Sequence, residues 1–259
     1  MKTTISIFLI LLLISLCSAQ VKSELITYKD GDLELEGYLA YDKILKSVRG
    51  GVLIVHNANG RNKFIQERAD ELAKIGYVAF ALDLFGKGVI PKDEEEEEEL
   101  TAQFLGENRQ LLRDRARLGL DILSQQSKVD INRLAAIGYG FGGMTVLELA
   151  RSGEPFTAAI NYFGALSTPT PEDAGNIKGA VLVLLGSEDP LVPKDEIEAF
   201  RSEMQNSNVD WQMNIYGGAY HGFTRYEFGF DPSSGKAYNY NADKRSWEAV
   251  KSLLHEKLK

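Results

Sequence analysis

Two short segments of the sequence each place a titratable side chain among turn-forming residues. Asp189 lies in a Gly-Ser-Glu-Asp-Pro segment, and His221 lies in a glycine-rich stretch that covers residues 216–223. A histidine that a carboxylate orients can act as a general base toward a hydroxyl, a thiol or a water molecule. Taken singly, each residue also has a structural explanation, because Asp189 before a proline can cap a turn and His221 can be a buried, hydrogen-bonded histidine.

A third segment, residues 138–143, has the pattern of a turn that presents a nucleophile. It reads Gly-Tyr-Gly-Phe-Gly-Gly between an apolar run and a helical pattern, which is the strand-turn-helix context of G-x-S-x-G or G-x-C-x-G. The central position is Gly140, which has no side chain to attack with. Nearby hydroxyls are not expected to replace it: Tyr139 should point away from the turn, Thr145 falls within the following helix, and Ser187 adjoins the acid.

Glycine at position 140 also has structural and cofactor-binding explanations. A residue at such a turn has unfavourable φ and ψ angles, which cost on the order of 1–3 kcal/mol, and glycine avoids most of that strain. Gly138, Gly140 and Gly143 also fit G-x-G-x-x-G, the pattern of a dinucleotide site. The pattern comes late in the chain, however, and no acidic residue ends the next predicted strand, Phe156–Phe163, to hold a ribose. We therefore expect no cofactor.

Apolar runs that alternate with helix-like stretches indicate the elements that must position these residues. An antiparallel hairpin is expected over 25–29 and 33–41, and continuous apolar runs then predict buried strands between helices. This order implies an α/β fold with one mostly parallel, twisted sheet, helices on both faces and an N-terminal antiparallel hairpin. Ligands bind at the carboxyl ends of such strands, where the three segments fall. The predicted strands are Gly51–His56, Tyr77–Leu82, Arg133–Gly138, Phe156–Phe163, Gly179–Gly186 and Asp210–Tyr216, and the predicted helices are Asn62–Ile75, Glu99–Ser124, Gly142–Arg151, Lys194–Gln205 and one that includes Trp247 and Leu258.

The composition is that of a globular protein, with 44% hydrophobic and 25% charged residues among 259. The formal net charge is −8, and the run of consecutive acids from Asp93 to Glu99 supplies most of it. Such a run is usually a solvated loop or a helix start, and carboxylates adjacent in sequence do not converge on one metal ion. The acidic balance argues against nucleic-acid binding, which needs a basic face. No linker divides the chain, so we expect one domain over residues 20–259.

The first 19 residues have the pattern of a secretory signal peptide. Lys2 precedes the aliphatic run Ile5–Leu16, and the small residue Ala19 follows it. A spanning helix needs about 20 apolar residues, so this run is too short for a stable membrane anchor. Cleavage after Ala19 predicts a secreted or periplasmic protein without cysteine, because Cys17 is the only one in the chain. Lipoprotein processing at Cys17 is the alternative. The bulky Leu16 before Cys17 argues against this processing, which requires a small residue at that position.

Together, these motifs resemble the dienelactone hydrolase family of the α/β-hydrolase superfamily over most of the chain after the leader. The order of the nucleophile, acid and histidine positions is that of the superfamily. The landmarks that carry the resemblance are Val55-His56-Asn57-Ala58-Asn59-Gly60, Leu72-Ala73-Lys74-Ile75-Gly76-Tyr77, Asp83-Leu84-Phe85-Gly86, the turn at 138–143, Ser187-Glu188-Asp189-Pro190 and His221-Gly222-Phe223.

The resemblance implies a hydrolase that acts on small esters or lactones through a Cys-His-Asp triad and without a metal. Asp189 would orient His221, which would serve as the base. The backbone N–H groups of Phe141 and Ala58 would form the oxyanion hole that stabilises the tetrahedral intermediate.

Other charged residues near the motifs have two interpretations each. Arg225 and Lys87 stand where the family often holds a substrate carboxylate, but both also fit ordinary surface charges. His56 ends a predicted strand beside the oxyanion loop, and we interpret it as a structural residue that braces this loop.

Two residues depart from the family. Gly140 replaces the nucleophile, and Asn57, which we also count as a substrate contact, stands where well-known members have a glutamate that helps to activate the thiol. Without a nucleophile, acyl transfer by the family's covalent route cannot occur. In one interpretation, the chain is still an ester or lactone hydrolase, in which His221 activates a water molecule directly. In the other, it is a catalytically inactive relative that binds a small ligand, such as an anion, in the old active-site pocket.

Overall fold

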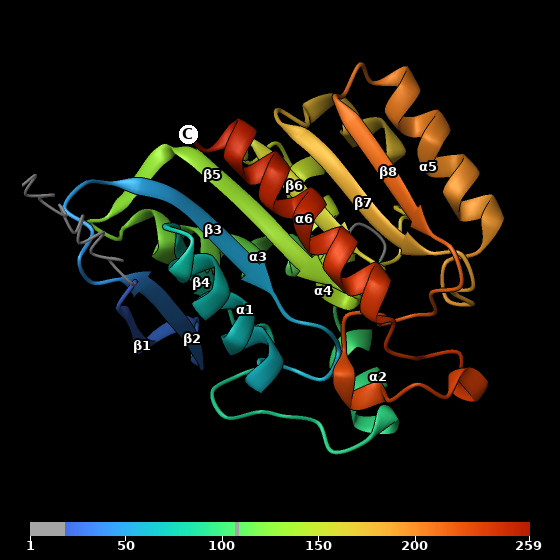
Figure 1. The fold of residues 1–259 in the computed structure, drawn as a ribbon, viewed down its shortest axis with the longest axis horizontal. Coiled ribbons are helices and arrows are strands. Elements are labelled where there is room, and N and C mark those ends of the chain that lie inside the picture. The colour runs from blue at the N-terminus through green and yellow to red at the C-terminus, as the bar shows by residue number, and fades with distance from the viewer. Residues whose placement is uncertain (1–18, 107–108) are drawn as a thin grey trace, which may run out of the picture.

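The computed structural model describes residues 19–106 and 109–259 (Figure 1). Apart from Ala19, the predicted signal peptide lies outside the described residues, and its cleavage stays a prediction. Within the described ranges, no helix combines the length and the apolar composition that crossing a membrane requires.

One sheet forms the centre of the described part of the chain. Its eight strands are β1 (Val21–Asp30), β2 (Leu33–Asp42), β3 (Arg49–Val55), β4 (Val78–Ala81), β5 (Val129–Tyr139), β6 (Ala158–Tyr162), β7 (Ala180–Gly186) and β8 (Trp211–Tyr216). They lie in the order β1-β2-β4-β3-β5-β6-β7-β8. β1 and β2 form the antiparallel hairpin, β2 pairs antiparallel with β4, and all other pairs are parallel. The predicted fold class is confirmed.

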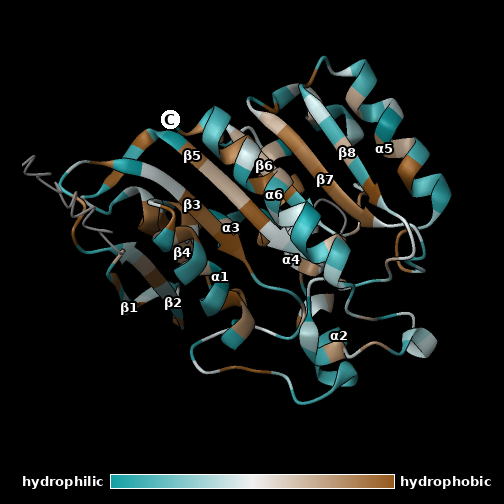
Figure 2. Ribbon diagram, viewed as in Figure 1, coloured by the Kyte–Doolittle hydropathy of each residue, from teal (hydrophilic) through white to brown (hydrophobic). Residues whose placement is uncertain are grey.

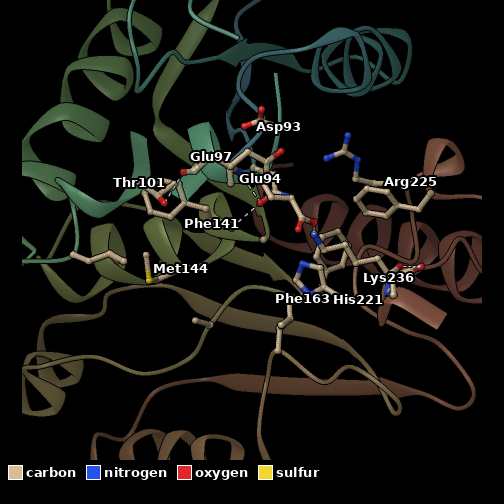
Figure 3. A pocket seen from close by; sticks show the side chains of 18 residues that line it. Asp93, Glu94, Glu97, Thr101, Phe141, Met144, Phe163, His221, Arg225 and Lys236 are labelled. Carbon is tan, nitrogen blue, oxygen red and sulfur yellow. Dashed lines mark hydrogen bonds and ion pairs between the residues drawn. The ribbon is translucent and has the colours of Figure 1, made fainter. Parts of the chain in front are cut away.

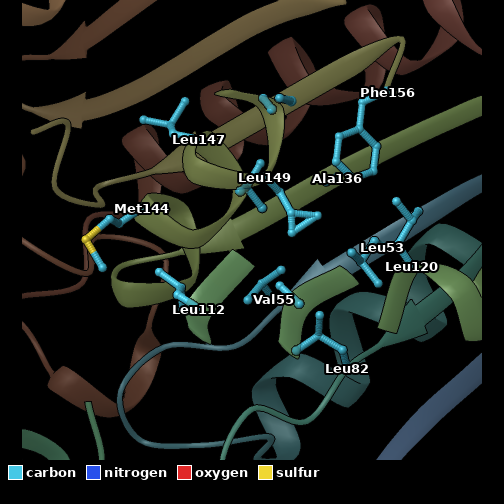
Figure 4. Packing of buried hydrophobic residues seen from close by; sticks show 14 of the residues in the cluster. Leu53, Val55, Leu82, Leu112, Leu120, Ala136, Met144, Leu147, Leu149 and Phe156 are labelled. Atoms are coloured by element: carbon cyan, nitrogen blue, oxygen red, sulfur yellow. The ribbon is translucent and has the colours of Figure 1, made fainter. Parts of the chain in front are cut away.

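Helices cover both faces of this sheet. They are α1 (Lys63–Lys74), α2 (Glu94–Ala102), α3 (Gln110–Ser124), α4 (Phe141–Arg151), α5 (Lys194–Asn206) and α6 (Tyr240–Lys257). Side chains of α1 and α6 share one apolar cluster with the sheet, and those of α3, α4 and α5 share a second cluster on the other face. The hydropathy colours in Figure 2 follow this arrangement, with apolar strands inside and polar outer sides on the helices. Figure 4 shows part of the second cluster, between the sheet and α3 and α4.

The acidic run begins a separate helix, so the single helix predicted over Glu99–Ser124 is wrong. The Asp93 side chain accepts a hydrogen bond of 3.0 Å from the Glu96 N–H and caps α2. The glutamates of the first turn then lie at the positive end of the helix dipole, where they are stabilising. α2 ends at Ala102, and Arg109, with a left-handed φ of 50°, precedes α3. The signal for the earlier start, an acidic cap with a glutamate three residues later, is present in the sequence.

Two glycines let the turn between β5 and α4 close tightly against β3. A Cβ atom on Gly138 would lie 1.9 Å from the Gly142 carbonyl oxygen, and one on Gly142 would lie 2.2 Å from the Val55 carbonyl oxygen. A larger residue at either position would push the turn away from β3, because the backbone leaves no space for it. The glycine pattern of residues 138–143 therefore fixes the place of Gly140 at the carboxyl end of β5.

A buried ion network ties α4, which follows this turn, to α5. The fully buried Arg151 guanidinium donates to both carboxylate oxygens of Glu203, at 2.7 and 2.8 Å, and to Glu148 at 3.1 Å. Arg113 of α3 also donates to Glu148, at 2.8 and 3.0 Å. Charges inside a protein are costly unless they are paired, so these contacts hold α4 in one position relative to α3 and α5.

Replacing the central cation of this network should destabilise the fold. Arg151→Met is expected to lower the free energy of unfolding by about 3–5 kcal/mol, because the buried Glu203 carboxylate loses its cation. Urea unfolding followed by circular dichroism measures the loss. Arg201→Met is the matched control, since Arg201 pairs with Glu198 on the exposed side of α5, the helix that carries Glu203, and we expect a change of about 0–1 kcal/mol there. Equal losses in the two variants would contradict the structural role of the network.

Candidate active site

A cavity of about 620 Å³ lies at the carboxyl ends of the parallel strands, beside the turn that contains Gly140 (Figure 3). Apolar side chains form much of its wall, and polar side chains reach it from several separate segments. The apolar residues are Ala58, Leu105, Phe141, Met144, Phe163, Ala165, Leu191 and Phe228, and the polar or charged residues are Asn57, Asp93, Glu94, Glu97, Thr101, His221, Arg225, Ser234 and Lys236. Cavities of this composition and size are typical small-molecule sites.

The structure brings Asp189 and His221 together. His221 Nδ1 lies 3.0 Å from Asp189 Oδ2, and the side chain of Asp189 is only 1% exposed. The loops after β7 and β8 meet here, with a hydrogen bond of 2.9 Å from the Glu188 N–H to the Ala219 carbonyl oxygen. Phe163 packs edge-on against the imidazole ring at a centroid distance of 5.1 Å. Since Nδ1 faces the carboxylate, Nε2 is the ring nitrogen that is available to a ligand in the cavity.

Gly140 has the backbone of a nucleophile position without the side chain. Its φ of 53° and ψ of −116° at the start of α4 lie in a region that residues with a Cβ atom rarely adopt. Its N–H donates to the Tyr162 carbonyl oxygen at 2.9 Å, which joins the turn to the end of β6. Gly140 lines the same cavity as His221.

The side chain of Asn57 occupies the space around this position. Its Oδ1 accepts hydrogen bonds from the backbone N–H groups of Ala58, at 2.7 Å, and of Phe141, at 3.0 Å. These are the two N–H groups that the sequence predicted for the oxyanion hole. A Cβ atom on Gly140 would lie 2.2 Å from the same Oδ1 and 2.7 Å from Asn57 Cγ. One carboxamide thus fills both the predicted oxyanion hole and the volume next to Gly140.

The loop that carries Asn57 is braced by His56, as predicted. The Leu84 N–H donates to His56 Nε2 at 3.1 Å, so the ring carries its proton on Nδ1 and donates from there to the Asn57 carbonyl oxygen at 2.7 Å. The ring is fully buried, and this burial lowers the pKa of His56 and favours the neutral form. The loop is therefore held by an uncharged hydrogen-bonding ring.

Arg225 lies in the wall of the cavity and is not a surface charge. The residue is 3% exposed, and its guanidinium lies over the rings of Phe228, at 4.8 Å, and Phe64, at 5.6 Å. Its Nε donates to the Glu227 carboxylate at 2.8 Å, and Nη2 donates to the same oxygen. The burial was missed in the sequence because one aromatic partner, Phe64, comes from a distant segment.

The second predicted cation does not reach the cavity. Lys87 is half exposed, pairs with Glu34 at 3.8 Å and does not line the cavity that contains His221. We therefore do not retain it as a candidate ligand-binding residue. No sequence pattern indicated Lys236, which lines the cavity and forms an ion pair with Glu94.

Helix α2 supplies an acidic wall that the sequence did not predict. Asp93, Glu94 and Glu97 line the cavity from one side, across from His221 (Figure 3). Burial raises the pKa of Glu97, and the nearby charges of Lys236 and Arg225 oppose this shift. The spacing of four residues between Asp93 and Glu97 places both on one side of a helix, which was the available signal.

The other hydroxyl candidates lie away from the nucleophile position. Tyr139 stacks on Tyr162 at 4.8 Å within the core, and burial raises the pKa of its phenol. The Thr145 hydroxyl donates to the Phe141 carbonyl oxygen at 2.8 Å, and the Ser187 hydroxyl donates to Glu188 at 2.9 Å. The described residues include no group of three or more potential metal ligands.

The chain is similar to known proteins over most of its length. A family model described as "Dienelactone hydrolase family" matches residues 35–258. The uncharacterized protein K02A2.1 of Caenorhabditis elegans is 34% identical over 155 residues, which cover 56% of this chain and 93% of the worm protein. A solved structure titled m3DLH has 40% identity and a TM-score of 0.88. A second, a dienelactone hydrolase-like promiscuous phosphotriesterase, P91, from metagenomic libraries, has 35% identity and a TM-score of 0.87. Each alignment with these structures covers 92% of this chain and 99% of the other.

The conflict between residue 140 and Asn57 can be measured as a coupling energy. Gly140→Ala should lower the free energy of unfolding through backbone strain, about 1–3 kcal/mol, and by displacing a carboxamide that two hydrogen bonds hold. In an Asn57→Ala background only the strain remains, so the same substitution should cost about 1–3 kcal/mol less. Urea unfolding of the four proteins in this double-mutant cycle gives the coupling. Identical losses in the two backgrounds would show that Asn57 does not fill this space.

Proposed function

The chain belongs to the dienelactone hydrolase family, whose substrates are small esters and lactones, and we propose that it binds such molecules or their carboxylate products without covalent acyl transfer. The proposal combines the family's cavity with the loss of its attacking atom. Of the two interpretations of the sequence, it is the inactive relative that binds a small ligand.

One observation carries this proposal: the Asn57 carboxamide next to Gly140. Covalent acyl transfer needs an atom that attacks the carbonyl carbon and donors that hold the developing oxyanion. Gly140 offers no such atom, and the two backbone N–H groups already donate to Asn57 Oδ1. Triads that lose their nucleophile typically retain roughly 10³–10⁴-fold catalysis over water, which comes from the oxyanion hole and from binding. With the hole filled, we expect even this residual catalysis to fall.

The cavity nevertheless keeps the features of a binding site. Apolar walls such as Phe141, Met144 and Phe163 would bury a small hydrocarbon frame, and a few polar groups would orient it. The buried Arg225 and the nitrogen of His221 that faces away from Asp189 favour a ligand with carbonyl or carboxylate oxygens.

The paired Asp189 and His221 favour a second candidate function, direct attack by water. A histidine held by a carboxylate can remove a proton from water while the water attacks an ester carbonyl. This route requires no side chain at position 140. The two backbone donors of the predicted oxyanion hole are occupied by Asn57 Oδ1, so we rank it below binding without turnover.

Wild-type protein should show almost no turnover but measurable binding. We expect rates near the uncatalysed background with p-nitrophenyl acetate and dihydrocoumarin, and also with paraoxon, which tests the phosphotriester chemistry named for the P91 relative. Isothermal titration with 3-(2-hydroxyphenyl)propanoate, the ring-opened product of dihydrocoumarin, should give saturable heat. Ala165→Trp, which fills the cavity, is the control and should abolish that heat. Rapid turnover that His221→Ala abolishes would favour water attack, and absent binding would refute the proposal.

Restoring acyl transfer should require two substitutions. Gly140→Cys supplies an attacking thiol, and Asn57→Ala frees the two oxyanion donors and removes the clash. Since one oxyanion-hole donor is worth about 10²–10³ in kcat, the double variant should hydrolyse p-nitrophenyl acetate at least about 10²-fold faster than Gly140→Cys alone. A Cys17→Ser background lets a thiol reagent report on position 140 only, because Cys17 is the chain's one cysteine. Adding His221→Ala should remove the gain, and a gain that survives it would contradict a triad-like geometry.

A further inference from the structure

The two ends of the Asn57 carboxamide have different surroundings. Its acceptor end receives the Ala58 and Phe141 N–H groups, whereas its NH₂ end has no hydrogen-bond partner among the residues that the structure describes. The orientation follows from chemistry, because only the oxygen of an amide can accept from two N–H donors. The NH₂ group is therefore a donor that is free for a ligand.

This donor lies beside the position of the missing nucleophile. Asn57 Nδ2 is 3.0 Å from the place that a Cβ atom of residue 140 would take, and both residues line the cavity. We propose that Asn57 replaces the oxyanion hole with its own NH₂ group and thereby determines that the cavity selects a carboxylate. The inference rests on the proposed binding function and adds the residue and the ligand group that define it.

Hydrogen bonding strengthens the new donor. Two backbone N–H groups withdraw electron density from the Asn57 oxygen, and chains of hydrogen bonds polarise one another in a low-dielectric site. The N–H bonds at Nδ2 are therefore better donors than those of a free amide. A negatively charged oxygen makes a stronger hydrogen bond to such a donor than a neutral carbonyl oxygen does.

The charged side chains around the cavity are arranged so that one anion can bind next to His221. Glu94 on the opposite wall is paired with Lys236, and Asp93 is held by the Glu96 N–H at the start of α2. Glu97 remains on that wall, across from His221 in Figure 3, where burial raises its pKa and the charges of Lys236 and Arg225 oppose that shift. The buried Arg225 also lines the cavity and contributes a positive charge, although it pairs with Glu227. A carboxylate would thus bind between Asn57 Nδ2 and His221 Nε2.

Two substitutions of Asn57 should act in opposite directions on carboxylate binding. Asn57→Asp keeps an oxygen in the hole but replaces the free donor with a negative oxygen, so we expect affinity for 3-(2-hydroxyphenyl)propanoate to fall at least about tenfold. Asn57→Ala instead uncovers the two backbone N–H groups, which take over as donors, so affinity should stay within about threefold of wild type or rise. Asn62→Asp is the matched control. It makes the same charge change at the cap of α1, where either side chain accepts the Ile65 N–H, and should change affinity less than threefold.

The outcomes separate this inference from the proposed function. If wild type binds the carboxylate and Asn57→Asp binds it equally well, the role of Asn57 is refuted while the binding function stands. If Asn57→Ala loses as much affinity as Asn57→Asp, the inference is also refuted, because the uncovered N–H groups then do not replace the side chain. If wild type does not bind, the proposed function itself fails. A ¹⁵N spectrum of wild-type protein gives a second readout that does not depend on how a variant folds. The Asn57 side-chain NH₂ signals are identified by their loss in Asn57→Asp. They should shift when the carboxylate is added, and signals that do not shift would overturn the inference.

Discussion

The close approach of β3, β5 and α4 at the turn around Gly140 is the constraint on which the site depends. Gly138 and Gly142 have no room for a Cβ atom, so the backbone of the turn is fixed against the end of β3. This packing aims the Phe141 N–H at the loop after β3, where it and the Ala58 N–H donate to the same oxygen, Asn57 Oδ1. The two donors exist because of backbone packing, whatever side chain residue 140 carries. The packing of the turn therefore keeps the two N–H groups close together although residue 140 has no side chain.

Leaving the Ala58 and Phe141 N–H groups without a hydrogen-bond acceptor would cost free energy of folding. The amide oxygen of residue 57 avoids that cost. Asn57 satisfies both with a single oxygen, and it can do so only because Gly140 leaves the adjacent volume empty. The two departures from the family are therefore one structural change. Glycine relieves the backbone strain of the turn, and the carboxamide replaces the water or substrate that the donors would otherwise bind.

The sequence predicted the sheet and the places of Asp189 and His221 because those depend on local patterns, namely apolar periodicity and glycine-rich turns after strands. It could not predict what depends on side-chain direction across distant segments. Asn57 was recognised as a departure, but its rotation into the oxyanion hole follows from contacts with Phe141, 84 residues away. Lys87 was misplaced for the same reason, since its position after a strand does not determine which way its side chain extends. The burial of Arg225 depends on the nearby ring of Phe228 and on that of Phe64, a residue far away in the sequence.

The retained pair of Asp189 and His221 is weak evidence for catalysis, because folding alone accounts for it. The Asp189 side chain is almost completely buried, and a buried carboxylate that loses its partner is strongly destabilising. Besides the imidazole, it receives only the Leu191 N–H, at 2.9 Å, among the hydrogen bonds of the described residues. Loss of His221 would thus destabilise the loops after β7 and β8 even in a protein that catalyses nothing. The informative feature is the open cavity beside the pair, since an unused cavity lined by charged groups has no stabilising role of its own, and this is why ligand binding is the function that the structure supports best.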